Sequence, residues 1–253
     1  HPIAYHRHHI KYPDSLRVDH VMRLHHLSWV PDGMPATRGV YVRYPADEMY
    51  AILSVESHRH RCAIAGENLG TVPEYVNEAM AHHGVSGLYV VQYEVPSDAN
   101  AAPADPPPAS VASLNTHDMP PFAAFWQGLE IGRWQALGLV TEAEARERME
   151  ERHMAKRNLV RFLERSGYLQ GDREDIGRIF RACLSFLNRS QSRTLLVNME
   201  DLWLETEQQN VPGVVDGHPN WQRKARHGFD AFSTMPEVLE LLRGLTRLGG
   251  AGD

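Results

Sequence analysis

Short apolar segments recur along the chain and alternate with longer stretches of helical periodicity. Apolar residues follow one another in these segments instead of alternating with polar ones, which is typical of strands buried on both faces of a parallel sheet. Strands that alternate with helices predict an α/β fold. We expect five strands, at Leu16–Met22, Arg61–Glu67, Ser86–Tyr93, Ser110–Asn115 and Arg193–Met199.

Helical periodicity is strongest in the second half of the chain, where residues 122–190 are predicted to be helical throughout. Apolar residues between positions 176 and 187 recur at intervals of three and four, which predicts a buried helix face. Other helices are expected at 45–61, at 71–82 and after residue 234. Three predicted helices open on threonine followed three residues later by glutamate, the pattern of a capping box: Thr71–Glu74, Thr141–Glu144 and Thr234–Glu237. An Ala- and Pro-rich loop is expected at Asp98–Ala109.

The composition is that of a globular protein and excludes several functional classes. The 253 residues are 42% hydrophobic and 23% charged, which supplies enough apolar surface for a core. Acidic residues outnumber Lys and Arg by 32 to 26, so no nucleic-acid partner is expected. No apolar run reaches the roughly 18 residues of a membrane span, so no membrane partner is expected. Two cysteines cannot form a disulfide scaffold and suit a reducing compartment, so we expect a cytoplasmic protein.

Three carboxylates lie at or just after predicted strands: Asp19, Glu67 and Asp118. In a parallel α/β barrel the loops that follow the strands meet at one end, so side chains far apart in sequence can converge there. Convergent acids suit a reaction that needs one protonated and one ionised carboxyl group, and cleavage of a glycosidic bond is such a reaction. The residues alone also allow a plainer interpretation, because an acid at a strand end is more often a helix cap or a solvated loop residue.

The neighbours of two of these acids favour the catalytic interpretation. Arg17 and Asp19 are two residues apart on a predicted strand, so they point to the same side and the guanidinium can hold the carboxylate ionised. Glu67 follows the apolar run Ala-Ile-Ala-Gly with no basic residue close behind it, which suits a protonated general acid. Histidines such as His58 and His60 lack Cys or acid partners at metal-ligand spacing, so no metal is expected.

The chain resembles the 4-alpha-glucanotransferase family, also called amylomaltases or disproportionating enzymes. The match covers nearly the whole chain and rests on four segments in order: LRVDHVMRLHHLSWVPDGMPATRGVYVRYP, AIAGENLGTVP, SLNTHDMPPF, and NMEDLW with QQNVPGVVDGHPNW. The family fold is a (β/α)8 barrel with inserted helical subdomains. The resemblance implies that residues 1–253 are the C-terminal part of the catalytic barrel, about five of its eight βα units, with a helical insertion at about 122–190.

The resemblance also implies a reaction, the retaining transfer of an α-1,4-glucan segment without a cofactor. A maltodextrin is the donor, and the 4-hydroxyl of another glucan or of glucose is the acceptor. Asp19 matches the nucleophile, Glu67 the general acid/base, and Asp118 the carboxylate that stabilises the transition state. Their common chemistry would be a covalent glycosyl-enzyme that the acceptor then resolves.

Other positions match residues around the scissile bond. Arg17 and His117 match residues that contact the sugar where cleavage occurs, and Asn210 matches a position that lines the pocket. Three positions depart from the family pattern without removing a catalytic group: Arg23, Asn68 and Val214. Arg23 stands where the family usually has glycine, and Asn68 stands where it usually has aspartate.

Family members are much longer than this chain, and a whole barrel has eight strands. We therefore expect an N-terminal half of the barrel in a longer protein, and we expect this chain to be neither stable nor active by itself, because an open sheet leaves exposed edges. Two alternatives remain open. The chain is an inactive truncated fragment that at most binds glucan, or it belongs to a retaining α-glucan hydrolase, which needs the same carboxylates.

Overall fold

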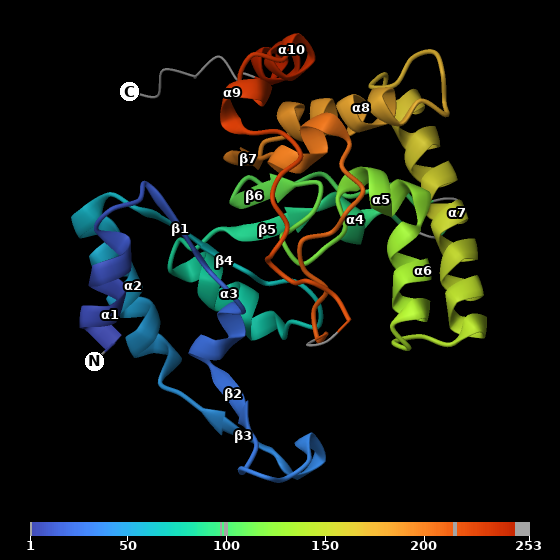
Figure 1. Cartoon of the computed structure of the whole chain (residues 1–253). Coiled ribbons are helices and arrows are strands. Elements are labelled where there is room, and N and C mark those ends of the chain that lie inside the picture. The colour runs from blue at the N-terminus through green and yellow to red at the C-terminus, as the bar shows by residue number, and fades with distance from the viewer. Residues whose placement is uncertain (1, 97, 99–100, 215–216, 246–253) are drawn as a thin grey trace. The chain divides into compact units, whose positions relative to one another are not determined.

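The structure is a computed structural model with an α/β architecture, and it describes residues 2–96, 98, 101–214 and 217–245 (Figure 1). Part of the predicted loop at 98–109 and two residues of the fourth resembling segment lie outside the described residues.

The chain divides into two compact units. Unit 1 comprises residues 1–88 and 108–111, and unit 2 comprises residues 89–107 and 112–253. Each unit has its own apolar core of buried side chains. The proposed catalytic residues therefore belong to two separately packed bodies.

Unit 1 is built around a parallel pair of strands. Its elements are α1 (Pro2–Ile10), β1 (Ser15–Val18), the 3-10 helix η1 (Val21–Leu24), β2 (His26–Trp29), the 3-10 helix η2 (Ala36–Arg38), β3 (Val40–Arg43), α2 (Ala46–His60), β4 (Ala63–Gly66) and α3 (Glu74–His82). β1 and β4 pair in parallel with Val18 opposite Gly66. α1 and α2 lie side by side (Figure 1). The parallel pair places the carboxyl ends of both strands at one edge.

Helices α1 and α2 are joined by a buried carboxylate. Tyr50, Leu53 and Glu56 follow one another at three-residue spacing on α2 and are all buried. The Glu56 carboxylate is paired with Arg7 Nη2 of α1 at 2.8 Å and with Arg59 Nη1 at 2.9 Å. A buried charge needs such partners, because burial without them is costly.

An antiparallel hairpin of β2 and β3 is absent from the elements predicted above. His26 is opposite Arg43, and Trp29 is opposite Val40. Trp29 and Val40 are exposed, so the hairpin strands lack the period-two burial by which a strand is recognised in a sequence. The indole Nε1 of Trp29 donates a hydrogen bond to the Tyr44 hydroxyl at 2.7 Å, which ties the hairpin to the residues before α2.

Unit 2 is mainly helical. Its elements are α4 (Val91–Glu94), α5 (Phe122–Gln127), α6 (Leu129–Ala136), α7 (Glu142–Arg165), α8 (Ile176–Arg189), β7 (Thr194–Leu196), the 3-10 helix η3 (Met199–Trp203), α9 (Phe229–Phe232) and α10 (Pro236–Gly244). Strands β5 (Gly87–Val90) and β6 (Ser110–Ser113) begin in unit 1 and end in unit 2, and a three-stranded sheet has the order β5-β6-β7. α6 and α7 run side by side (Figure 1).

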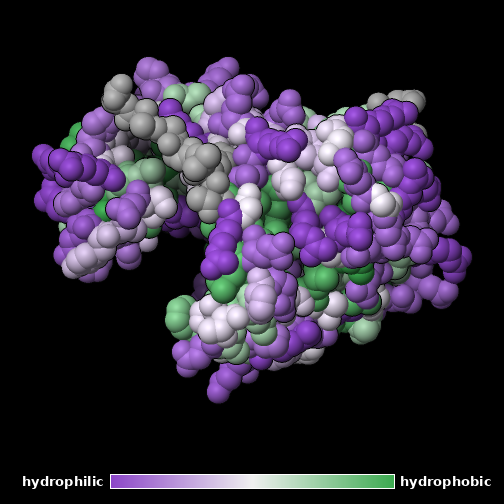
Figure 2. Space-filling model, turned by 90° about the horizontal axis from the view of Figure 1, so that it is seen from above, coloured by the Kyte–Doolittle hydropathy of each residue, from purple (hydrophilic) through white to green (hydrophobic). Residues whose placement is uncertain are grey.

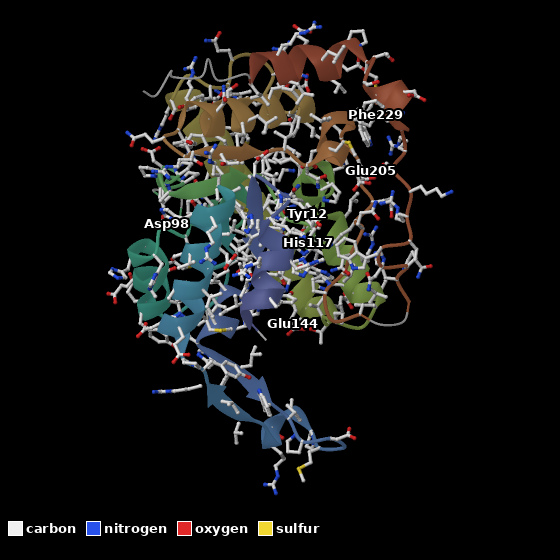
Figure 3. The ribbon with its side chains drawn as sticks, turned by 90° about the vertical axis from the view of Figure 1, so that its left-hand side faces the viewer. Tyr12, Asp98, His117, Glu144, Glu205 and Phe229 are labelled. Atoms are coloured by element: carbon white, nitrogen blue, oxygen red, sulfur yellow. The ribbon has the colours of Figure 1, made fainter. Side chains whose placement is uncertain are left out.

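The predicted buried face of α8 is confirmed. Ile179, Cys183 and Leu187 are fully buried in the core of unit 2. The predicted capping box of α7 is also confirmed, because Thr141 Oγ1 accepts from the Glu144 backbone N–H at 3.3 Å and Glu144 Oε2 accepts from the Thr141 N–H at 2.7 Å. Glu144 is labelled near the start of α7 in Figure 3.

The other two predicted capping boxes are wrong. α3 has Pro73 as its N-cap and α10 has Met235, and neither cap makes a side-chain hydrogen bond. Both sequences read Thr-x-Pro-Glu, and proline decides where the helix begins because its fixed φ suits a helix start. The threonine then lies outside the helix, too far away to cap its first turn.

The predicted strands are longer than the observed ones. β1 ends at Val18, β5 ends at Val90 where α4 begins, and β7 ends at Leu196 before η3. A short helix follows each of these strands. Val21 and Leu24 of η1 and Val91 of α4 are buried there, whereas the buried residues of η3 are Glu200 and Asp201. An isolated parallel bridge joins Ala65 of β4 to Ser86, the residue before β5.

The visible surface is mostly hydrophilic, with hydrophobic residues between the polar ones (Figure 2). Among the described residues, none of the helices has both the length and the apolar character that crossing a bilayer requires.

Candidate active site

Asp19 and Glu67 occupy equivalent positions on two neighbouring strands of unit 1. Each is the first residue beyond its strand, and Val18 and Gly66 directly before them are paired. The Glu67 backbone N–H donates to Val18 O at 2.9 Å, and Val21 N–H donates to Glu67 O at 2.9 Å. Adjacent strands lie about 4.8 Å apart, so this register brings the two carboxylates to the same edge as neighbours.

The Glu67 carboxylate is held by backbone donors. Its Oε2 accepts from the His20 N–H at 2.7 Å, and its Oε1 accepts from the Leu69 N–H at 3.0 Å. His20 has a left-handed conformation with φ of 45°, which is uncommon for a residue with a Cβ. This strained residue directly follows Asp19, so the turn after the Asp19 position also orients the Glu67 side chain.

Gly66, directly before Glu67, lies closely packed against side chains of η1 and α3. A Cβ atom at this position would lie 2.8 Å from Val21 Cγ2 and 2.9 Å from Met80 Cε. Only glycine fits at that distance, so the residue before Glu67 has to lack a side chain.

Asp19 forms an ion pair with the strand residue two positions before it. Arg17 Nη2 donates to Asp19 Oδ1 at 2.6 Å. The Asp19 side chain is 64% exposed and the Arg17 side chain 31% exposed, so a ligand can reach the carboxylate. A charge-assisted hydrogen bond of this kind holds the carboxylate in a defined orientation.

Asn68, the residue directly after Glu67, is held by two hydrogen bonds of its side-chain amide. Its Oδ1 accepts from the Leu88 N–H at 2.9 Å, and its Nδ2 donates to Asn77 Oδ1 at 2.9 Å. An aspartate could accept from Leu88 but could not donate to the Asn77 oxygen. The side-chain amide of Asn68 is therefore complementary to that of Asn77 in α3, because it supplies the donor that the Asn77 oxygen accepts from.

Arg23 lies in η1 beside a pocket of unit 1 with a volume of about 440 Å³. The pocket is also lined by Tyr5, Leu27 and Met49, and neither Asp19 nor Glu67 lines it. Arg23 therefore lines a pocket that neither carboxylate lines, while its backbone N–H donates to His20 O at 2.9 Å.

Asp118 of unit 2 is held mainly by side chains. Asn210 Nδ2 donates to Asp118 Oδ1 at 2.6 Å, and His117 Nε2 lies 3.2 Å from Asp118 Oδ2. The backbone of Asp118 is also held, because Gln208 Nε2 donates to its carbonyl at 3.3 Å and its N–H donates to Thr116 Oγ1 at 3.3 Å. Asn210 is 92 positions away in sequence, and it comes from the loop after η3.

Sequence reasoning missed two residues beside Asp118. Gln208 is buried and contacts Asp118 as described, and the exposed Trp221 ring has its centroid 5.7 Å from that of His117, which is labelled in Figure 3. Trp221 has a positive φ of 61°. Nothing in their spacing indicates these contacts, since both arise from the path of the C-terminal segment.

The six candidate residues thus form two groups of three. Unit 1 holds Arg17, Asp19 and Glu67, and unit 2 holds the others: His117, Asp118 and Asn210. Each group has an acidic residue in contact with a cation or an amide. Within the described ranges, no three His, Cys, Asp or Glu side chains are arranged to hold a metal ion.

A protein-family model described as 4-alpha-glucanotransferase matches residues 3–229. Two curated relatives with the name 4-alpha-glucanotransferase are similar to most of this chain. The protein of Haemophilus influenzae is 32% identical over 222 residues, which is 85% of this chain and 32% of the relative. The protein of Mycobacterium bovis is 34% identical over 221 residues, which is 84% of this chain and 30% of the relative.

Two solved structures are similar in fold. An amylomaltase from Corynebacterium glutamicum has a TM-score of 0.77 and 25% identity, and the match covers 87% of this chain and 33% of that protein. An amylomaltase from Streptococcus agalactiae, solved in complex with acarbose, has a TM-score of 0.69 and 20% identity over 96% of this chain and 43% of that protein. The chain thus spans about a third of the length of the curated relatives it matches.

Proposed function

The chain belongs to the 4-alpha-glucanotransferase family, and we propose that it carries out, or supplies the catalytic residues for, retaining transfer between α-1,4-glucans. A maltodextrin is the donor, and the 4-hydroxyl of a second glucan or of glucose is the acceptor. The relatives' names support the reaction, and the placement of the carboxylates supports the residues.

In the first step Glu67 donates its proton to the glycosidic oxygen while Asp19 attacks the anomeric carbon. The carbon–oxygen bond to the leaving sugar breaks, and an ester bond to Asp19 forms. In the second step the ionised Glu67 takes the proton of the acceptor 4-hydroxyl. The acceptor oxygen then displaces Asp19, so the new linkage has the original configuration.

One observation carries this proposal, the register of β1 and β4. Retaining enzymes need two carboxyl groups about 5–5.5 Å apart. The backbones of residues that follow paired positions on adjacent parallel strands lie about 4.8 Å apart, which lets carboxyl groups on the same side come within such a separation. Asp19 and Glu67 are such a pair. An inverting reaction would need a wider gap with room for a water molecule.

The remaining candidate residues contact the Asp19 carboxylate or would stabilise the positive charge that develops on the sugar. Arg17 orients the Asp19 carboxylate through its 2.6 Å contact. Asp118, fixed by Asn210 and beside His117, would stabilise the positive charge on the distorted sugar ring. His117 and Asn210 also offer polar hydrogens to sugar hydroxyls.

We further propose that residues 1–253 form the C-terminal part of a glucanotransferase barrel, with the helices between 122 and 190 as an insertion. The TM-score of 0.77 over a third of the Corynebacterium amylomaltase supports this placement. The free, buried Cys62 and Cys183 support a cytoplasmic location. Joining this chain to an N-terminal barrel half should raise its melting temperature, whereas an unchanged melting temperature would count against the placement.

A trapped intermediate tests the assignment of Asp19 and Glu67. In the chain joined to an N-terminal barrel half, and with α-maltotriosyl fluoride as donor, Glu67→Gln should still form the glycosyl ester, because fluoride leaves without a proton. The ester should accumulate, because no base activates the acceptor. Mass spectrometry should find the added sugar on the peptide that contains Asp19.

The matched control is Asp14→Asn, an exposed carboxylate at the opposite end of the same strand, which should turn over normally. An adduct on another residue would refute the assignment. Maltotriose distinguishes the reaction types: glucose with longer maltodextrins indicates transfer, and a steady gain in reducing ends indicates hydrolysis.

A further inference from the structure

The loop that carries His117 and Asp118 is closed at both ends by one carboxylate. Asp201 Oδ2 accepts from Asn115 Nδ2 at 2.7 Å, and Asp201 Oδ1 accepts from the Phe122 backbone N–H at 2.6 Å. Asn115 follows β6, and Phe122 is the first residue of α5. Asp201 lies in η3, far away in sequence, so the residues between 115 and 122 form a loop whose ends are held by one side chain.

Other side chains of the same segment complete the arrangement. Asn198, the N-cap of η3, donates from Nδ2 to Asn115 Oδ1 at 3.3 Å. The Asn115 amide is therefore held through both its oxygen and its nitrogen. Gln208 Nε2 reaches the Asp118 carbonyl in the middle of the loop at 3.3 Å. The segment 198–210 thus holds the loop at its start, its middle and its end.

Asp201 is a costly residue for a purely structural role. It is 1% exposed, and among the described contacts its two oxygens face neutral N–H donors rather than a cation. Burial raises the pKa of Asp201 to about 7, and the nearby Glu200 carboxylate contributes to the increase. An apolar side chain of similar size would pack in this core without that cost, but it could not accept both hydrogen bonds.

We propose that Asp201 is a positioning residue that fixes the 115–122 loop and thereby orients Asp118 toward the sugar. This inference rests on the proposed function only for the role of Asp118, since the clamp itself is a property of the loop. Asp201 contacts no substrate in this scheme. It acts through Asn115 and the Phe122 amide.

Hydrogen exchange tests the clamp without any assay of activity. Asp201→Asn keeps the size of the side chain but has one acceptor oxygen in place of two, so one end of the loop loses its partner. At a pH above the pKa of Asp201, where its carboxyl group is ionised, amides between 115 and 122 should exchange about tenfold faster in the variant, as expected for the loss of one hydrogen bond to a charged group. The remainder of unit 2 should exchange as in the native chain.

The matched control is Glu130→Gln, which also converts a buried carboxylate of unit 2 into an amide. Glu130 is 1% exposed and pairs with Arg152 Nη2 at 2.6 Å, with no contact to the loop. This variant should leave the loop as well protected as its surroundings. The clamp would be overturned if the loop exchanged equally slowly in Asp201→Asn and in the native chain. It would also be overturned if exchange in Asp201→Asn became faster by the same factor everywhere in unit 2.

Asn115→Ala provides a second variant that removes one end of the clamp only. It should speed exchange at the start of the loop, and combining it with Asp201→Asn should add little, because both act on the same contact. Additive effects of the two variants would overturn the shared mechanism.

Kinetics of the transfer reaction separate positioning from simple destabilisation. Asp201→Asn should lower kcat about tenfold with KM within about twofold, because Asp118 acts on the transition state more than on the bound substrate. A change in KM alone would contradict the positioning role. If Asp118→Asn itself left transfer intact, the proposed role of Asp118 would fail, while the exchange result would still decide the clamp.

Discussion

The two groups of candidate residues, one in each unit, are held in different ways. In unit 1 the Glu67 carboxylate accepts from two backbone N–H groups, His20 and Leu69, that belong to turns at paired strand ends. In unit 2 the Asp118 carboxylate accepts from the side chain of Asn210, and its loop is closed by the side chain of Asp201. Backbone positioning survives most substitutions, whereas side-chain positioning depends on a few particular residues.

The largest expected difference between the units is their response to pH. Burial raises the pKa of Asp201 in unit 2 to about 7, from 3.8 in an unfolded chain. Between these two values the folded state keeps a proton that the unfolded state has released. The free energy of unfolding of unit 2 therefore falls as pH rises through this window, by about 4 kcal/mol in total. Urea unfolding, monitored by hydrogen exchange in peptides of unit 2, should show this decrease in the free energy of unfolding. Asp201→Asn should abolish the decrease.

Unit 1 should respond in the opposite direction. The hydrogen bond from Arg7, together with the charges of Arg7 and Arg59, lowers the pKa of Glu56 to about 2, from 4.5 in an unfolded chain. Its contribution to stability is complete above pH 4.5 and is lost as the pH falls toward 2. The same exchange series should therefore show unit 1 peptides weakening in acid, and Glu56→Gln should abolish the weakening. Parallel pH profiles in both units would contradict the comparison.

Loss of the Asn210 side chain should have the next largest effect. Asn210→Ala removes the 2.6 Å hydrogen bond to Asp118 Oδ1. Hydrogen bonds to charged groups contribute about 1.5–3 kcal/mol, so kcat/KM for maltotriose disproportionation should fall about 10- to 100-fold. Initial rates of glucose release give the measurement.

Glu207→Gln is the control for this prediction. Glu207 lies in the same segment, but its exposed carboxylate pairs with Arg133 at 3.0 Å and does not contact Asp118. An exposed pair contributes little, so the rate should stay near the native value. Equal losses in both variants would mean that the segment as a whole, rather than the Asn210 amide, sets the activity.

The same contrast explains which parts of the site could be predicted from the sequence. Glu67 lies at the end of an apolar run, but the predicted strand Leu16–Met22 contained Asp19, so local patterns indicated only one of the two strand ends. The parallel pairing of β1 with β4 places the two residues side by side. The contact of Asp118 with Asn210 spans 92 positions and depends on the path of a loop without periodicity. No hydrophobic pattern encodes such a path, so only the resemblance to the family pointed to Asn210.

Local structure that depends on a single residue was also hard to predict. Proline at 73 and 236 decided where two helices begin, although the Thr-x-x-Glu pattern pointed elsewhere.

The hairpin of β2 and β3 has exposed apolar side chains, so it does not show the burial pattern of a strand. The stripe of α8 was predictable because fourteen helical residues repeat the same spacing against one core.

The smallest expected effect tests the backbone positioning of Glu67. His20 adopts φ of 45°, where a Cβ is strained and glycine is not. His20→Gly should therefore have a higher free energy of unfolding than His20→Ala, by about 1 kcal/mol. The comparison is between two variants that both lack the imidazole, so it reports the conformation of the turn and not the side chain. Urea unfolding of unit 1 provides the measurement.

Ser28, an exposed residue of β2, supplies the matched pair. At an ordinary strand position glycine loses more conformational freedom on folding, so Ser28→Gly should be less stable than Ser28→Ala by about 0.5–1 kcal/mol. The two positions should thus rank glycine and alanine in opposite order. The same order at both would mean that the turn after Asp19 is not left-handed, and the N–H of His20 would then point away from the Glu67 carboxylate.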